Sequence, residues 1–137
     1  MFGSAFSAAQ AYSRVGVDTS VMAANPHRLI ALLFDGAEKQ LLVADTAIAN
    51  GDLATKGEAI TRTIRIIDEG LKAALAPDAG EISANLSALY DYILRRLLDV
   101  SCTNDRAIVA EVRTLLHEIG SAWSEIEHAP NSGGSAA

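Results

Sequence analysis

The sequence is poor in the residues on which several common classes of protein depend. Its 137 residues include one cysteine, Cys102, which excludes a disulfide scaffold and a multi-cysteine zinc site. Aromatic residues make up 5% of the chain, whereas hydrophobic residues make up 50%. The apolar mass is therefore mainly aliphatic, which favours packed helices over an aromatic-rich sandwich. Three prolines and ten glycines are too few for a collagenous or loop-dominated chain.

Positive charge and long apolar runs are also scarce. The chain contains eleven Lys and Arg residues and 17 Asp and Glu residues, which gives a formal net charge of −6. Without a basic run or a basic face, we expect no binding to nucleic acid or to an anionic membrane. No apolar run approaches the length of a bilayer span, and residues 1–24 lack the continuous apolar segment of a signal peptide. We therefore expect a cytoplasmic protein without membrane insertion.

Start and stop signals divide the chain into four helical segments. Asn25 and Pro26 form a typical helix start, Gly51 a typical stop, and Pro130 ends the last segment. The predicted helices span about 26–50, 52–76, 82–100 and 105–127, and Thr103 or Asn104 is expected to cap the last of them. Because short turns join them, the sequence predicts an all-α, antiparallel up-down-up-down four-helix bundle. We assign the bundle to 25–128, a mobile N-terminal cap to 1–24 and a disordered tail to 129–137.

Apolar residues recur every three or four positions, but some helices carry more of them than a bundle core needs. In the second helix, Ile60, Ile64 and Ile67 are predicted to face inward, and a parallel row containing Thr63 and Ile66 is predicted to face outward. The first helix is apolar over an arc of roughly 200° at 100° per residue. The residues expected on this surplus apolar surface are Leu29, Leu32, Gly36, Val43, Ile66, Tyr90 and Tyr92.

Two interpretations of the surplus apolar surface remain open. It can reflect irregular packing or cover by the N-terminal segment, or it can form a groove for a partner helix. Both hold if the N-terminal segment fills the groove until a partner displaces it. Arg96 lies near the apolar edge of the third helix and could pair with a carboxylate of a partner.

Catalytic and metal-binding patterns are weak. Glu125 and His128 form a single Glu-x-x-His step, whereas a di-iron bundle needs two such steps and two further carboxylates. His117-Glu118 lacks the second histidine of a zincin, and no glycine-rich phosphate loop is present. We therefore expect no enzyme activity, no cofactor and no metal site.

Several motifs together resemble the family of flagellar export chaperones called FliS. They include Asn-Pro-His-Arg-Leu-Ile at 25–30, Leu-Phe-Asp-Gly-Ala at 33–37 and Asn-Leu-Ser-Ala-Leu-Tyr-Asp-Tyr-Ile-Leu-Arg-Arg-Leu at 85–97. Shorter matches begin with Ala11-Tyr12 and end with Ala122-Trp123. The resemblance covers residues from about 11 to 127 with the spacing intact, and the main departure is the glycine-rich tail after Pro130.

The resemblance implies a cytoplasmic, non-enzymatic chaperone for flagellin. Members of the family bind the disordered C-terminal segment of flagellin, block its premature polymerisation and present it to the export gate. The segment around Tyr12 and Val17 is expected to act as a lid over the apolar groove, either as a lid alone or with contacts of its own to flagellin. In the absence of flagellin we expect a monomer or a weak dimer. The alternative from the residues alone is a helical homo-oligomer with a regulatory or structural role.

Overall fold

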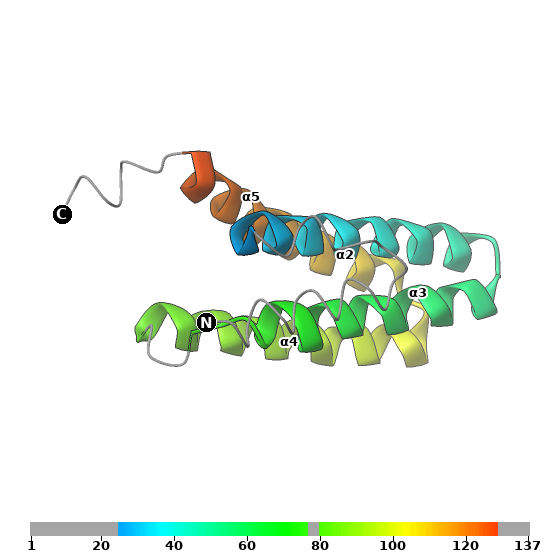
Figure 1. Ribbon diagram of the computed structural model, residues 1–137. Helices are drawn as coiled ribbons and strands as arrows, with labels where there is room; N and C mark the ends of the chain where they lie inside the picture. The colour runs from blue at the N-terminus through cyan, green and yellow to red at the C-terminus, as the bar shows by residue number, and fades with distance from the viewer. Residues whose placement is uncertain (1–24, 77–79, 129–137) are drawn as a thin grey trace.

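The computed structural model describes residues 25–76 and 80–128, and over these residues the protein is an all-α bundle. The helices are α2 (Pro26–Ala49), α3 (Leu53–Arg65), α4 (Glu81–Thr103) and α5 (Arg106–His128), and a π-helix, η2 (Ile66–Lys72), continues α3. Figure 1 shows α2 and α5 as one layer above a second layer of α3 and α4. The predicted fold class is confirmed, and the four predicted helices match the observed ones to within a few residues.

Local side-chain chemistry sets the helix boundaries. Asn25 caps α2 by accepting a hydrogen bond from the Arg28 amide at 3.1 Å, and Asp52 caps α3 by accepting one from the Thr55 amide at 3.1 Å. Gly51 lies between these helices with φ of 73°, a left-handed conformation that costs glycine little. The predicted boundaries at these turns therefore follow from the residues that the turns contain.

The turn between α4 and α5 differs in detail from the prediction. Thr103 or Asn104 was expected to cap the last helix, but the Asp105 carboxylate accepts the hydrogen bond from the Ala107 amide at 2.9 Å. Asn104 instead ends α4 in the left-handed conformation, with φ of 56°. Asparagine tolerates this conformation because its short polar side chain can bond locally.

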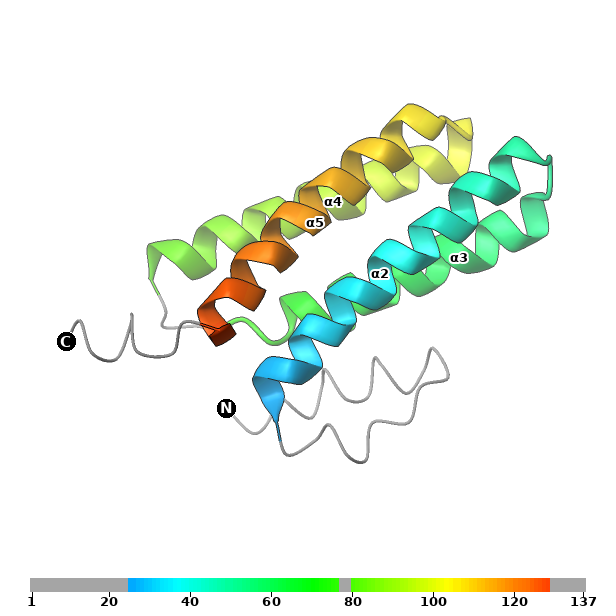
Figure 2. The same cartoon turned by 90° about the horizontal axis from the view of Figure 1, so that it is seen from above.

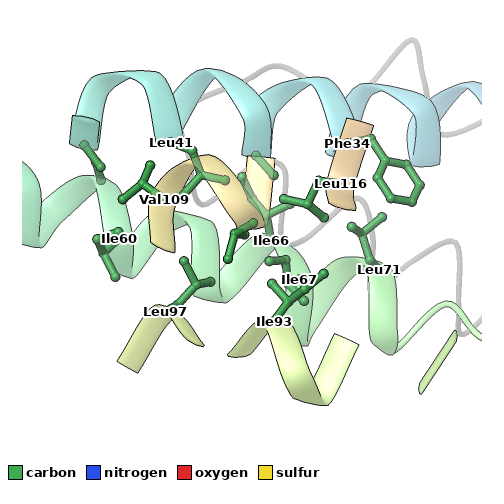
Figure 3. Close-up of a cluster of buried hydrophobic side chains, with 14 of the residues drawn as sticks. Phe34, Leu41, Ile60, Ile66, Ile67, Leu71, Ile93, Leu97, Val109 and Leu116 are labelled. Carbon is green, nitrogen blue, oxygen red and sulfur yellow. The ribbon is translucent and has the colours of Figure 1, made fainter. Parts of the chain in front are cut away.

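Each helix packs against two neighbours, so the core lies along the centre of the bundle. α2 contacts α3 with η2 on one side and α5 on the other, while α4 contacts α5 and the α3–η2 helix. Figure 2 shows the same arrangement from above, with the turns α2–α3 and α4–α5 at one end. Figure 3 shows Ile66, Ile67 and Ile93 pointing into the centre with Leu41 and Leu116.

A buried lysine connects α3 to the turn between α4 and α5. Only 7% of Lys56 is exposed, and its ammonium donates hydrogen bonds to the Ser101 carbonyl at 3.1 Å and to Asn104 Oδ1 at 2.6 Å. A positive charge is favourable at this position because the last carbonyls of a helix carry partial negative charge. Lys56 therefore has a structural role at the end of α4.

At the other end of the bundle, an aromatic side chain of α2 stacks on one of α5. The rings of His27 and Trp123 stack with centroids 4.2 Å apart and planes at 12°. The His27 Nε2 lies 3.0 Å from the Trp123 carbonyl, and Trp123 Nε1 donates to the His27 carbonyl at 3.0 Å. The first turn of α2 is thereby fixed to the last turns of α5.

Candidate partner-binding face

An accessible apolar surface in the described part of the chain lies on α2 along its side toward α3. We call this surface the α2–α3 face and define it by Leu32, Gly36, Leu42 and Val43. Leu32 and Gly36 are half-buried, whereas Leu42 and Val43 are 46% and 43% exposed. Ile66 lies directly beneath, since a Cβ on Gly36 would be 3.8 Å from Ile66 Cδ1. The surface is therefore a shallow apolar strip supported by core side chains and interrupted by the exposed Asp35–Lys39 ion pair.

The strip continues to the turn between α2 and α3. There a depression is lined by Leu42, Val43, Thr46, Ala47, Asn50, Asp52 and Thr55. Its apolar part comes from α2, and its polar part comes from the ends of both helices. Such a mixture can bury the apolar side of a peptide while its backbone groups find polar partners.

Three of the residues that were predicted to lie on the surface are in the core. Leu29 and Ile66 have no exposed surface and Tyr90 is 3% exposed, so their prediction as accessible groove residues is wrong. Leu29 precedes Leu33 by one helical turn and therefore shares its inward direction. Burial also raises the pKa of the Tyr90 hydroxyl well above its usual value.

The predicted orientation of the second helix is also wrong. Thr63 and Ile66 were predicted to face outward, but neither is exposed, whereas Ile64 is only partly buried. The reason is that the α3–η2 helix packs against both α2 and α4, so both of its apolar rows are covered. Thr63 tolerates this burial because its hydroxyl donates to the Ala59 carbonyl at 2.8 Å.

Tyr92 and Arg96 lie on a polar seam between α4 and α5. The Tyr92 hydroxyl donates to Glu111 Oε2 at 2.5 Å, and Arg96 Nε donates to Glu111 Oε1 at 2.9 Å. Arg96 also bonds Asp99 at 3.0 Å. The Tyr92 hydrogen bond, followed by the Arg96 hydrogen bond, lowers the pKa of the Glu111 carboxyl. Arg96 was predicted to pair with a partner's carboxylate, but here it is paired with two carboxylates of its own chain.

A second polar seam joins α5 to α2. Arg106 donates to both carboxylate oxygens of Asp45, at 2.8 and 3.1 Å, and the hydrogen bond from Arg106 lowers the pKa of Asp45. Farther along the same pair of helices, His117 Nδ1 lies 3.2 Å from Glu38 Oε1. Both sides of α5 are therefore crossed by charged contacts within the chain.

Of the residues predicted for the partner surface, Leu32, Gly36 and Val43 lie together on the α2–α3 face. Tyr12 and Val17 fall outside the described residues. Leu42 was missed, although the consecutive apolar residues 41–43 could have revealed it. Three successive residues span about 200° of a helix, so they cannot all point into one core.

Neither a metal cluster nor a membrane-spanning helix is found among the described residues. Among them, no three His, Cys, Asp or Glu side chains gather in a way that could hold a metal ion. No helix within residues 25–76 and 80–128 is long and apolar enough to cross a membrane. The fold and the α2–α3 face together define a class, that of all-α helical bundles with an accessible apolar surface.

Comparison with known proteins identifies the family within that class. The family model described as "Flagellar protein FliS" matches residues 8–130, and the chain belongs to this family. It is 48% identical over 118 residues to the flagellar secretion chaperone FliS of Salmonella typhimurium, covering 85% of this chain and 87% of the relative. It is 38% identical over 125 residues to the flagellar secretion chaperone FliSB of Pseudomonas aeruginosa, covering 90% of this chain and 98% of that relative. These relatives are named as chaperones, which implies a non-enzymatic role.

Proposed function

We propose that this protein is a cytoplasmic export chaperone that binds the C-terminal segment of flagellin on the α2–α3 face. Binding would keep flagellin from polymerising before export and would deliver it to the flagellar type III export apparatus, including components of the export gate. The observation that supports this role most directly is the accessible apolar strip of Leu32, Leu42 and Val43 on a bundle of this family.

The physical requirements of such a chaperone agree with this surface. A disordered segment loses conformational entropy when it becomes ordered, so it must bury a large area to bind usefully. Apolar contacts contribute roughly 25 cal/mol per Å² of buried surface. A strip along a helix of 24 residues can supply many such contacts without a deep pocket.

Titration calorimetry with a purified C-terminal flagellin segment tests this proposal. We expect one-to-one binding with a negative heat-capacity change, which is the signature of apolar burial. Leu32→Asp and Val43→Asp should each weaken binding about tenfold or more, since a charge placed in an apolar contact costs more than 1.4 kcal/mol. Ala110→Asp is the control, because Ala110 is exposed on α5, away from the α2–α3 face.

The outcomes separate the alternatives. Wild-type protein that fails to bind the C-terminal segment but binds another part of flagellin contradicts the proposal. Light scattering that shows a stable oligomer of this chain, unchanged by the segment, favours the helical homo-oligomer instead. Circular dichroism of Leu32→Asp and Val43→Asp must show a folded bundle, whereas Ile66→Asp should unfold because Ile66 is fully buried.

We also propose that residues 1–24 act as a lid that competes with flagellin, with Tyr12 and Val17 among its apolar anchors. A tyrosine suits this role because its ring can be buried while its hydroxyl keeps a polar partner. A lid would lower the net affinity for flagellin and so make release at the export apparatus easier.

A further inference from the structure

The turn between α2 and α3 contains the one Asn-Gly pair of the sequence, Asn50 followed by Gly51. Asn50 ends α2 and is exposed, and its side-chain amide has no hydrogen-bond partner within residues 25–76 and 80–128. Asparagine is a chemically labile residue, and it is most labile before glycine. The reason is that glycine has no side chain to keep its nitrogen away from the preceding amide.

Two hydrogen bonds hold this turn in the Schellman arrangement that ends many helices. The Gly51 amide donates to the Ile48 carbonyl at 3.1 Å. The Asp52 amide donates to the Ala47 carbonyl at 2.8 Å. In this turn the Gly51 nitrogen keeps its proton in a hydrogen bond, and Asn50 has ψ of 0°, which does not align its Cγ with that nitrogen. A reaction between the two residues therefore requires the turn to open.

We propose that Asn50 is a site of spontaneous deamidation and that opening of the α2–α3 turn controls its rate. In the open turn the Gly51 nitrogen loses its proton to water and attacks Asn50 Cγ. The new bond from nitrogen to Cγ closes a cyclic imide, while the bond from Cγ to the side-chain nitrogen breaks and ammonia leaves. Water then opens the imide at either carbonyl and leaves aspartate or isoaspartate at position 50. One water is consumed and one ammonia is released, without oxidation or reduction.

The reaction changes both the charge and the backbone at the end of the α2–α3 face. Either product places a carboxylate at the C-terminal end of α2, where the last carbonyls of the helix already carry partial negative charge. The same carboxylate enters the depression that Leu42 and Val43 line. Isoaspartate also adds a methylene to the main chain, which lengthens a turn whose two hydrogen bonds fit the normal backbone. We therefore expect the turn to be less stable after the reaction.

Asp52 offers a way to change how often the turn opens. Its carboxylate accepts hydrogen bonds from the Thr55 amide at 3.1 Å and from the Thr55 hydroxyl at 2.6 Å, and this cap fixes α3 directly after Gly51. Asp52→Ala should speed deamidation of Asn50 about fivefold, because the loss of an N-cap raises the open fraction of the turn by about that factor. Asp52→Asn keeps a capping oxygen but removes the charge, so the rate should stay within about twofold of wild type. Asn25→Ala removes the cap at the far end of α2 and is the matched control, with no change expected.

Peptide-mapping mass spectrometry of the full-length protein, incubated at mildly alkaline pH, measures the reaction. The exchange of amide for acid raises the mass of the peptide that contains the reacting asparagine. We expect Asn50 to react before Asn85, which is also exposed but lies within α4 and precedes Leu86. We also expect the folded protein to react about tenfold more slowly than the urea-unfolded protein, since only molecules with an open turn react.

Three results would overturn the inference. If Asn50 stays unreacted in the folded protein long after the unfolded protein has converted completely, the turn does not open and the site is inert. If Asn85 reacts as fast as Asn50 in the folded protein, the turn confers no selectivity. If Asp52→Asn speeds the reaction as much as Asp52→Ala, the charge of Asp52 controls the rate and opening of the turn does not.

Discussion

At the scale of single residues, Glu111 shows how one carboxylate can hold two helices together. It accepts hydrogen bonds from Tyr92 and Arg96, both on α4, while it lies on α5 itself. All three residues are partly exposed, so water screens the interaction and its contribution to stability is modest. Its main effect is to fix the relative position of α4 and α5.

The lowered pKa of Glu111 predicts how this contact depends on pH. A carboxyl group whose pKa in the folded state lies below its ordinary 4.5 stabilises the fold above 4.5, and this contribution is lost as the pH falls through the lowered value. We expect Tyr92→Phe to lower the stability at neutral pH and to have a smaller effect well below 4.5. Urea unfolding of both proteins at the two pH values measures this, with Arg28→Gln as the control. An equal loss at both pH values would show that the hydroxyl acts through packing alone.

At the scale of the helices, two glycines inside helices have opposite surroundings. Gly120 of α5 lies against α2, and a Cβ there would be 3.1 Å from both Cβ and Cγ of Phe34. Phe34 is 3% exposed and packed in the core, so it has little room to move. Gly57 of α3 has no atom within 4 Å of the same position. Glycine at 120 therefore sets how closely α5 approaches α2, whereas glycine at 57 does not affect packing within the chain.

This contrast gives a matched pair of substitutions. Gly120→Ala should lower the free energy of unfolding by about 1–3 kcal/mol, because the added methyl overpacks the contact with Phe34. Gly57→Ala should raise it by up to about 1 kcal/mol through helix propensity. Chemical denaturation monitored by the single tryptophan, Trp123, measures both. If both substitutions stabilise the protein equally, the approach of α5 to α2 is not limited by Gly120.

At the scale of the whole molecule, the sides of the bundle differ in chemistry. Both sides of α5 are crossed by contacts between charged or polar side chains, namely Arg106–Asp45, His117–Glu38, Arg96–Glu111 and Tyr92–Glu111. The α2–α3 face instead presents Leu32, Gly36 and Val43. The accessible apolar residues of α2 therefore lie away from the two seams that cross α5, although the exposed Asp35–Lys39 ion pair lies among them.

Removal of residues 1–17 tests the proposed lid at this scale. A lid that is closed in ten of every eleven molecules weakens the binding free energy of a competing ligand by about 1.4 kcal/mol. Truncation should therefore tighten flagellin binding about tenfold. It should also raise self-association by exposing apolar surface, which light scattering would detect. Weaker binding together with more self-association would show that the segment also contacts flagellin. A truncated protein that stays monomeric and binds unchanged would contradict both versions.

Much of the architecture follows from the sequence alone. Local signals such as Asn25-Pro26, Gly51 and Asp52 are sufficient to place helix ends, because capping and left-handed turns depend on neighbouring residues only. The three- and four-residue spacing of apolar residues likewise predicts helices, and the short turns predict their antiparallel order. The motifs at 25–30, 33–37 and 85–97, with the shorter matches around them, carry the family resemblance.

The tertiary structure decided which apolar residues are core and which are accessible. Periodicity indicates how wide the apolar arc of a helix is, but the neighbouring helices determine how much of that arc is covered. Ile66 is therefore fully buried between neighbouring helices and Ile64 only partly, contrary to the prediction from the sequence. Contacts between residues far apart in the chain, such as His27 with Trp123 and Lys56 with Ser101, have no local signal at all. They form only because the bundle brings the ends of different helices together.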